Sequence, residues 1–185
     1  MNVKTKLNFS LAVIFIIGFT ALSFTIGTAQ EKSKKQLKEE KKLEKQNQIA
    51  LLVDAKEFVF VADRMLPQGG RSFNLTSDYF AEFHSDIIKC DLPFVGRAFG
   101  GGYGGDGGMQ FEGKPSVYSI EKEKKNYVIK IDVKGANDSY FMTLLVYFEG
   151  SATLTINSNN RSSISYDGDI KVFKKNNEVE SKIKK

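Results

Sequence analysis

Two residue types that often carry chemistry occur once each in this chain of 185 residues, as His84 and Cys90. Zinc sites need several Cys, His or acidic ligands at short spacings, and neither C-x-x-C nor H-x-x-x-H occurs. A cysteine nucleophile needs a positioned base, for which His84 is the single candidate. Alternation in Ile87–Leu92 places Cys90 on the same side as Ile88 and Leu92, which predicts a buried, inert thiol. We therefore expect no metal, no cofactor and no catalytic residue, and we expect His84 to be a partly exposed strand residue.

A glycine-rich segment is the second candidate for function. Eight of the thirteen residues in Gly96–Gly108 are glycine, half of the chain's total. They match G-x-G-x-x-G formally, but no helix follows that could point its N-terminus at a phosphate. Two interpretations stay open: a flexible crossover between strands, or a loop lining the open end of a barrel where a ligand could sit. In the second interpretation the ligand-binding residues are Arg97, Phe99, Tyr103, Asp106 and, from the turn 159–161, Arg161.

Hydrolytic chemistry has little support in the sequence. Serine is abundant, so a Ser-His-Asp set cannot be dismissed by counting, but no G-x-S-x-G elbow occurs. Glu121 and Glu123 lie two residues apart among lysines, a pattern typical of a solvated strand end and not of a carboxyl pair tuned for acid–base catalysis. A hydrolase whose site follows no motif is therefore the least favoured of three functions.

The first 29 residues have the features of a secretory signal peptide. Lys4 and Lys6 precede an apolar run over 11–26, and Gly27-Thr28-Ala29 supplies small residues at the −3 and −1 positions of a cleavage site. An uncleaved anchor is the alternative, because the run approaches the ~18 apolar residues of a transmembrane helix. We expect cleavage and a periplasmic or secreted protein, with membrane association only through an uncleaved signal.

The formal net charge of +5 does not describe the folded part of the chain. The signal contributes two positive charges, and the segments 31–45 and 174–185 carry an excess of three each. Residues 47–173 have 13 basic and 16 acidic side chains. A nucleic-acid platform needs a clustered basic stripe on the domain itself, so we expect no nucleic-acid partner.

The elements that must position these residues are mostly strands. Residues 31–56 predict a helix, because Glu, Lys, Gln and Leu dominate and Gly and Pro are absent. From Phe58 the apolar period changes from 3.6 to 2. Strands are expected at 58–62, 72–75, 79–85, 118–123, 127–134, 139–149, 152–157 and 162–172. Short strands joined by Gly, Asn and Asp turns predict a mainly β domain, an antiparallel meander closing towards a barrel or sandwich.

Burial patterns predict how these strands are covered. Tyr127–Lys134 has one apolar and one charged face, which is typical of a half-buried strand. Residues 139–149 are apolar on both faces, so this strand should be central, with the barrel interior on one face and the helix 48–56 on the other. The expected domains are a signal peptide (1–29), a charged helical leader (30–47), a β domain with its docking helix (48–173) and a disordered basic tail (174–185).

Several long blocks resemble the exported bacterial domain-of-unknown-function family 4251. The blocks are Phe58–Arg71, Asn74–Tyr79, Leu92–Ala98, Tyr103–Gly108, Gly150–Thr155 and Ser158–Gly168, which together span about residues 50–172. The resemblance implies an exported, lipocalin-like antiparallel β barrel or half-barrel with a leading helix. It implies no activity, and it carries over no catalytic residue.

The expected function is an exported, non-enzymatic binding module of the cell envelope. Its partner would be a small apolar or amphipathic ligand or an envelope protein. The alternative is a structural or stress-related envelope protein whose barrel is filled by its own side chains, as small barrels often are. The volume enclosed by the barrel separates these two functions. The sequence does not determine the oligomeric state.

Cleavage of the signal peptide gives a direct test of export. The intact mass of the exported protein should match a chain that begins at Gln30, because the small residues before it suit signal peptidase. A mature mass that still includes residues 1–29 would make the protein membrane-anchored.

Overall fold

The computed structural model describes residues 33–99, 108–136 and 138–173. The expected signal peptide, the tail 174–185, Tyr103 and Asp106 lie outside the described residues. The chain's own contacts group it into two compact units, Met1–Glu39 and Glu40–Lys185, and the sheet belongs to the second. Within the described ranges, no helix is both long and apolar enough to cross a membrane.

The helix α2 (Lys34–Ala55) has recognisable signals at both ends. At its start the Gln36 amide nitrogen donates to Ser33 Oγ and the Ser33 amide nitrogen donates to Gln36 Oε1, which is a capping box. At its end Lys56 adopts a φ of 56°, and the amide nitrogens of Lys56 and Glu57 donate to the Val53 and Leu52 carbonyls. This is a Schellman motif, and it turns the chain sharply into the first strand.

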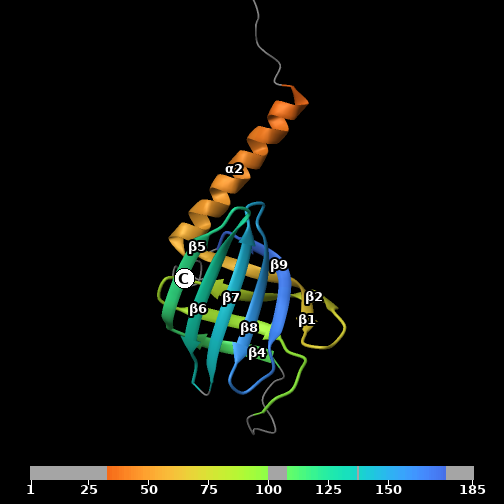
Figure 1. Ribbon diagram of the computed structural model, residues 1–185, viewed down its shortest axis with the longest axis vertical. Coiled ribbons are helices and arrows are strands. Elements are labelled where there is room, and N and C mark those ends of the chain that lie inside the picture. The colour runs from red at the N-terminus through yellow and green to blue at the C-terminus, as the bar shows by residue number, and fades with distance from the viewer. Residues whose placement is uncertain (1–32, 100–107, 137, 174–185) are drawn as a thin grey trace, which may run out of the picture. The chain divides into compact units, whose positions relative to one another are not determined.

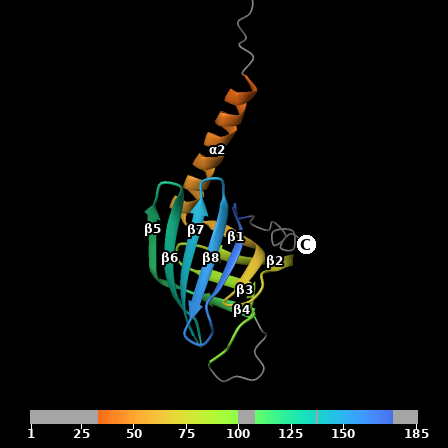
Figure 2. The same cartoon turned by 45° about the vertical axis from the view of Figure 1, so that its right-hand side comes forward.

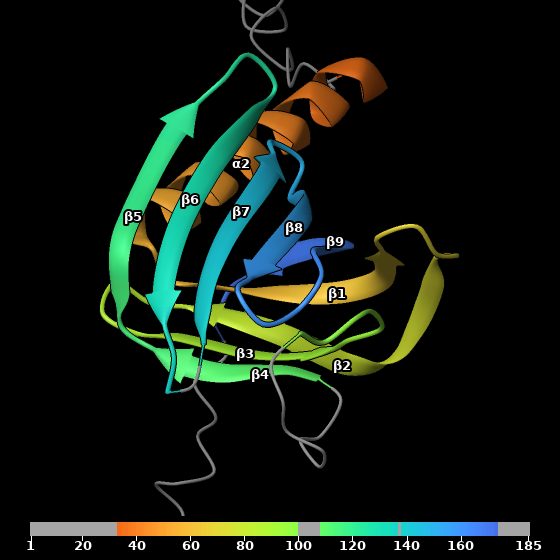
Figure 3. The ribbon, with the colours of Figure 1, turned by 60° about the horizontal axis from the view of Figure 1, so that its bottom comes forward.

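Nine antiparallel strands form a single sheet in the order β4-β3-β2-β1-β9-β8-β7-β6-β5. Two meanders, β1–β4 and β5–β9, are joined because β1 pairs with β9, and Figures 1 and 3 show β5–β8 crossing over β1–β4. The strands are β1 (Phe58–Pro67), β2 (Phe73–Phe83), β3 (Ile88–Pro93), β4 (Gly108–Gly113), β5 (Pro115–Lys122), β6 (Asn126–Lys134), β7 (Ser139–Tyr147), β8 (Ser151–Ser158) and β9 (Ile164–Lys171).

The sheet curves until its two edges come near each other. The edge strands β4 and β5 are consecutive in the chain, with Lys114 alone between them. The β5–β6 and β7–β8 hairpins lie at the same end of the sheet as the last turns of α2 (Figure 2). The predicted fold class, a mainly β protein with an antiparallel sheet nearly closed into a barrel and one leading helix, is confirmed, and the lipocalin-like description fits it.

The inward side chains form one buried hydrophobic cluster inside the sheet. Ile49 and Val53 of α2 join them, and Tyr118 and Ile120 of β5 pack against them. No described polar or charged side chain is buried. The strand residues that are 5 % or less exposed are Phe58, Phe60, Ala62, Met65, Ala81, Phe83, Ile88, Cys90, Leu92, Met109, Tyr127, Ile129, Ile131, Val133, Met142, Leu144, Val146, Ala152, Leu154, Ile156, Ile164, Tyr166 and Ile170. A continuous apolar core of this kind is the main source of folding free energy.

Three expectations about individual elements were wrong. The helix does not cover the outer face of β7, where Phe141 is 45 % exposed, because Ile49 and Val53 pack into the core cluster. The two short strands expected over 72–85 are one strand, β2, whose register with β1 shifts between Ala62 and Arg64. The strand β4 was not predicted, because glycines flank its short alternation on both sides.

The backbones of β1 and β9 approach closely at Gly168. This residue of β9 pairs with Ala62 of β1 beside the register shift. A Cβ atom added to Gly168 would lie 1.9 Å from the Val61 carbonyl oxygen and 3.0 Å from the Ala62 Cα. Any side chain here would therefore push β1 away from β9.

Replacement of Gly168 tests how strongly the sheet depends on this approach. Gly168→Ala should lower the free energy of unfolding by about 3 kcal/mol, measured by urea denaturation, because backbone atoms must move to admit the methyl group. Gly70→Ala is the matched control, since the nearest atom to its added Cβ is 3.5 Å away. Equal stability of the two variants would contradict the close approach.

Candidate functional site

The chain that enters the glycine-rich segment is fixed to the turn between β8 and β9. The Arg97 amide nitrogen donates to Ser162 Oγ at 3.1 Å, and the Ser162 amide nitrogen donates to the Arg97 carbonyl at 2.9 Å. The Phe99 amide nitrogen donates to the Asn160 carbonyl at 2.7 Å, and Ala98 forms an antiparallel bridge with Arg161. The first residues of the segment therefore act as a short extra strand.

The Arg161 side chain fastens the other end of the same segment. Its guanidinium donates to the Gly108 carbonyl and lies 5.2 Å from the centroid of the Phe94 ring. The cation–π contact and the hydrogen bond together tie β4 to the residues that follow β3. Arg161 thus contacts both ends of the glycine-rich segment.

Polar groups near the β8–β9 turn form hydrogen bonds within and between the hairpins at that end of the sheet. The Asp138 carboxylate accepts from the Ser158 hydroxyl, from the Ser139 amide nitrogen at 2.7 Å and from the Asn159 amide nitrogen at 3.2 Å. It therefore links the β6–β7 hairpin to the β8–β9 turn. The Tyr140 ring stacks on Phe111 with centroids 3.7 Å apart, and burial, followed by the Asp138 carboxylate, raises the Tyr140 pKa.

The predicted ligand-binding residues are therefore only partly brought together. Arg97 and Phe99 adjoin Arg161 through their backbones, while the Phe99 side chain is 68 % exposed. The Arg161 guanidinium already has two partners within the chain. Tyr103 and Asp106 lie outside the described residues, and the ligand site at this end stays a prediction.

A groove on the outer face of β2, β1 and β9 is a second candidate, with a volume of about 490 Å³. Its floor is apolar and consists of Val59 and Val61 of β1 and Phe80 of β2, and none of the three belongs to the buried core. Val172 and Phe173, which follow β9, form one wall, and Asp78, Glu82 and Lys171 complete the lining. Cavities of 550 and 330 Å³ at two hairpins have no large apolar side chain in their lining.

Phe173, in the wall of the groove, contacts the residue that follows β2. The edge of the Phe173 ring meets the His84 ring, with centroids 4.9 Å apart. His84 Nδ1 lies 2.8 Å from the Glu57 carboxylate, and the His84 side chain is 19 % exposed. The single histidine is partly exposed, as predicted, but it follows the end of β2 and does not lie in a strand. It orients the chain that leaves β9.

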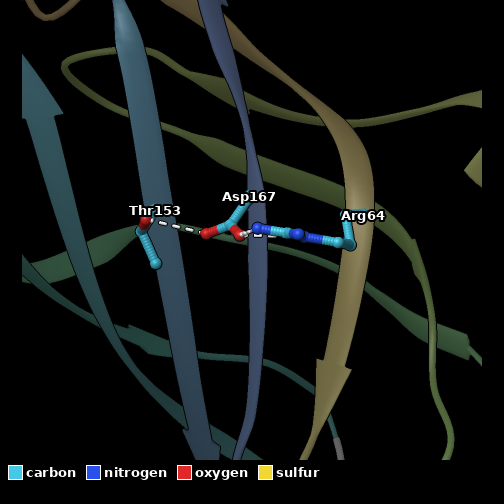
Figure 4. Close-up of polar contacts among 3 residues, drawn as sticks. All are labelled: Arg64, Thr153 and Asp167. Carbon is cyan, nitrogen blue, oxygen red and sulfur yellow. Dashed lines mark hydrogen bonds and ion pairs between the residues drawn. The ribbon is translucent and has the colours of Figure 1, made fainter. Parts of the chain in front are cut away.

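Figure 4 shows a polar network beside the groove on β1, β9 and β8. Both Nε and Nη2 of Arg64 donate to Asp167 Oδ2, and Thr153 Oγ1 donates to Asp167 Oδ1 at 2.9 Å. The positive charge of Arg64 is thus matched by Asp167. Among the described residues, Asp167 is the one carboxylate that forms an ion pair with Arg64.

The single cysteine has no catalytic surroundings. Cys90 is 3 % exposed on the core face of β3, with Ile88 and Leu92 on the same face, as predicted. Burial, with a smaller effect from Asp91, raises the pKa of its thiol well above the usual value. A thiol in this state is a poor nucleophile, because the thiolate is the reactive form.

Comparison with known proteins identifies the family. The domain of unknown function DUF4251 matches residues 40–170. The chain belongs to the DUF4251 family. A crystal structure of a DUF4251 family protein from Bacteroides eggerthii superposes with a TM-score of 0.56 at 21 % identity, covering 69 % of this chain and 87 % of that one. At this identity the likeness shows the fold alone. No curated protein matches the chain.

Sequence reasoning did not find the groove of this DUF4251 protein. The signal was present in β1, whose apolar residues alternate on both faces, Phe58 and Phe60 inward and Val59 and Val61 outward. Such a pattern predicts a strand that is covered on both faces. Its outer face is instead only half-buried, beside Phe80.

The structural role of Arg161 can be tested by comparison with Arg97, which lies next to the bridge between Ala98 and Arg161. Arg161→Gln should lower the free energy of unfolding by about 1–2 kcal/mol, because it removes the contact with the Phe94 ring and weakens the bond to the Gly108 carbonyl. Arg97→Gln is the control, since Arg97 is exposed and its contacts are made by its backbone. Equal urea midpoints for the two variants would contradict this role.

Proposed function

We propose that this DUF4251 protein is an exported, non-enzymatic binding module of the cell envelope, and that it holds an apolar or amphipathic ligand in the outer groove. One contrast supports the proposal: the inward side chains are buried against one another, while Val59, Val61 and Phe80 line an open groove. In this proposal the ligand binds on the outer face of the sheet.

The size and composition of the groove suit this function. Ligand sites commonly have volumes of about 300–1,000 Å³ with a mostly apolar lining and a few polar groups, and the groove has about 490 Å³. Apolar side chains gathered on an outer face gain free energy when a partner removes them from water. Asp78, Glu82 and Lys171 at the border supply the polar groups that would orient a ligand.

The titratable groups support a non-enzymatic role. Within the part of the chain that the structure describes, four side chains have clearly shifted pKa values, namely Cys90, Tyr118, Tyr140 and Tyr166, and in each case burial is the largest cause. Groups tuned for catalysis more often combine burial with a strong charge partner inside a cleft. None of the four lines the groove.

A structural envelope protein is the second candidate function, and the continuous buried cluster favours it. None of the three cavities described above is lined by a core side chain. A barrel filled by its own side chains can act as a stable scaffold without a ligand. The two candidate functions differ in what the outer groove does.

Binding of an uncharged fluorescent probe, N-phenyl-1-naphthylamine, separates the two functions. The mature protein should bind the probe with increased fluorescence, and Phe80→Ser should weaken binding about tenfold, because it removes a large part of the apolar floor. Phe141→Ser is the control, since Phe141 is an exposed aromatic residue on the outer face of β7. Absence of binding, or equal loss in both variants with unchanged melting temperatures, would favour the structural function.

A further inference from the structure

The strand register determines which charges surround the apolar floor of the groove. On β1, Val61 lies between Phe80 of β2 and Asp169 of β9. Val59 lies between Glu82 of β2 and Lys171 of β9. The floor is therefore bordered on both sides by charged residues of the neighbouring strands.

Negative charge predominates around this floor. Asp78, Glu82 and Asp169 lie around Val61, and the described amines beside them are those of Lys171 and of Lys89, which lies opposite Glu82 on β3. Asp78 and Asp169 are exposed, and none of the three carboxylates forms an ion pair with another described residue. Arg64, the nearby arginine of β1, is bound to Asp167. These three carboxylates are therefore available to an incoming cation.

We infer that the occupant of the groove is a cationic amphipathic peptide segment. Its apolar side chains rest on Val59, Val61 and Phe80, and its Lys or Arg side chains reach Asp78, Glu82 and Asp169. This inference rests on the proposed function and names the partner of the same groove. Opposite charges at the border steer association and orient the partner, while the apolar floor supplies most of the affinity.

The spacing of the carboxylates favours a peptide over a small cation. Neighbouring strands lie about 4.8 Å apart, so β2 and β9, on either side of β1, are separated by about 10 Å. Carboxylates on both sides of an apolar centre match a chain that presents basic and apolar side chains together on one face. A second copy presenting the same face would bring carboxylates against carboxylates, which costs free energy. A basic segment of another protein avoids this repulsion.

Two peptides of opposite charge test the inference by fluorescence anisotropy. One dye-labelled heptapeptide has the order Lys-Lys-Leu-Leu-Lys-Lys-Leu, so that each face of the extended chain carries both residue types, and its match has glutamate in place of lysine. The mature protein should bind the lysine peptide at least tenfold more tightly at low salt, and added salt should weaken that binding, because exposed charges are screened. Equal affinity for the two peptides would overturn the inference.

Variants place the effect at the groove. Asp78→Asn combined with Asp169→Asn should weaken lysine-peptide binding about tenfold. Asp54→Asn combined with Asp86→Asn removes the same charge at exposed positions that do not line the groove, and should leave the affinity unchanged. An equal loss in both pairs would mean that net charge alone attracts the peptide, which overturns the inference.

Two further results distinguish failure of this inference from failure of the proposed function. Binding of the uncharged probe that depends on Phe80, without preference for the lysine peptide, would overturn the inference and leave the proposed function standing. Absence of both kinds of binding would overturn both. Lysine-peptide binding that appears only in a chain ending at Phe173 would show that the chain's own residues 174–185 occupy the groove, and would overturn a partner in trans.

Discussion

The pairing of β1 with β9 is the contact on which the rest of the structure depends, because it joins two meanders into one sheet. It requires the glycine at position 168, since the β1 backbone approaches too closely for any Cβ. It also places Asp167 beside Arg64, so that the outer face has a charge-assisted link at the irregular point of the ladder. The core, the network of Arg64 with Asp167 and the outer groove all depend on the register between β1 and β9.

The fold could be predicted from the sequence wherever alternation was regular. Tyr127, Ile129, Ile131 and Val133 are all buried on one face of β6, and Cys90 lies on the core face of β3. Alternation did not predict β2 as one strand, because its central residues are polar and resemble a loop. The register shift in its pairing with β1 lets the strand continue through them. Alternation also failed for the helix, because sequence shows which residues are apolar and not which element covers them. Ile49 and Val53 therefore pack into the core, although Phe141 makes the outer face of β7 apolar as well.

The site was harder to predict than the fold. Arginine and aromatic residues near glycine suggested a ligand at the open end of the barrel, but Arg161 is already engaged by Phe94 and the Gly108 carbonyl. The groove draws its floor from β1 and β2 and its wall from residues after β9, and the register that unites them is a property of the tertiary structure. In the sequence, the groove was indicated only by Phe58–Val61, where apolar residues occupy both faces of the strand. That pattern indicates a covered strand as readily as a binding surface.

The long sequence separation between β1 and β9 has a consequence for folding kinetics. Arg64 and Asp167 are 103 residues apart, so the ladder that unites the sheet forms only when nearly the whole domain is available. Topologies dominated by such non-local pairing fold slowly, because the entropy of closing a long loop precedes the gain from contacts. Until β9 is in place, β1 and β8 each present an open edge. We therefore expect this ladder to close late in folding, and we expect the strands to be most vulnerable to aggregation before it closes.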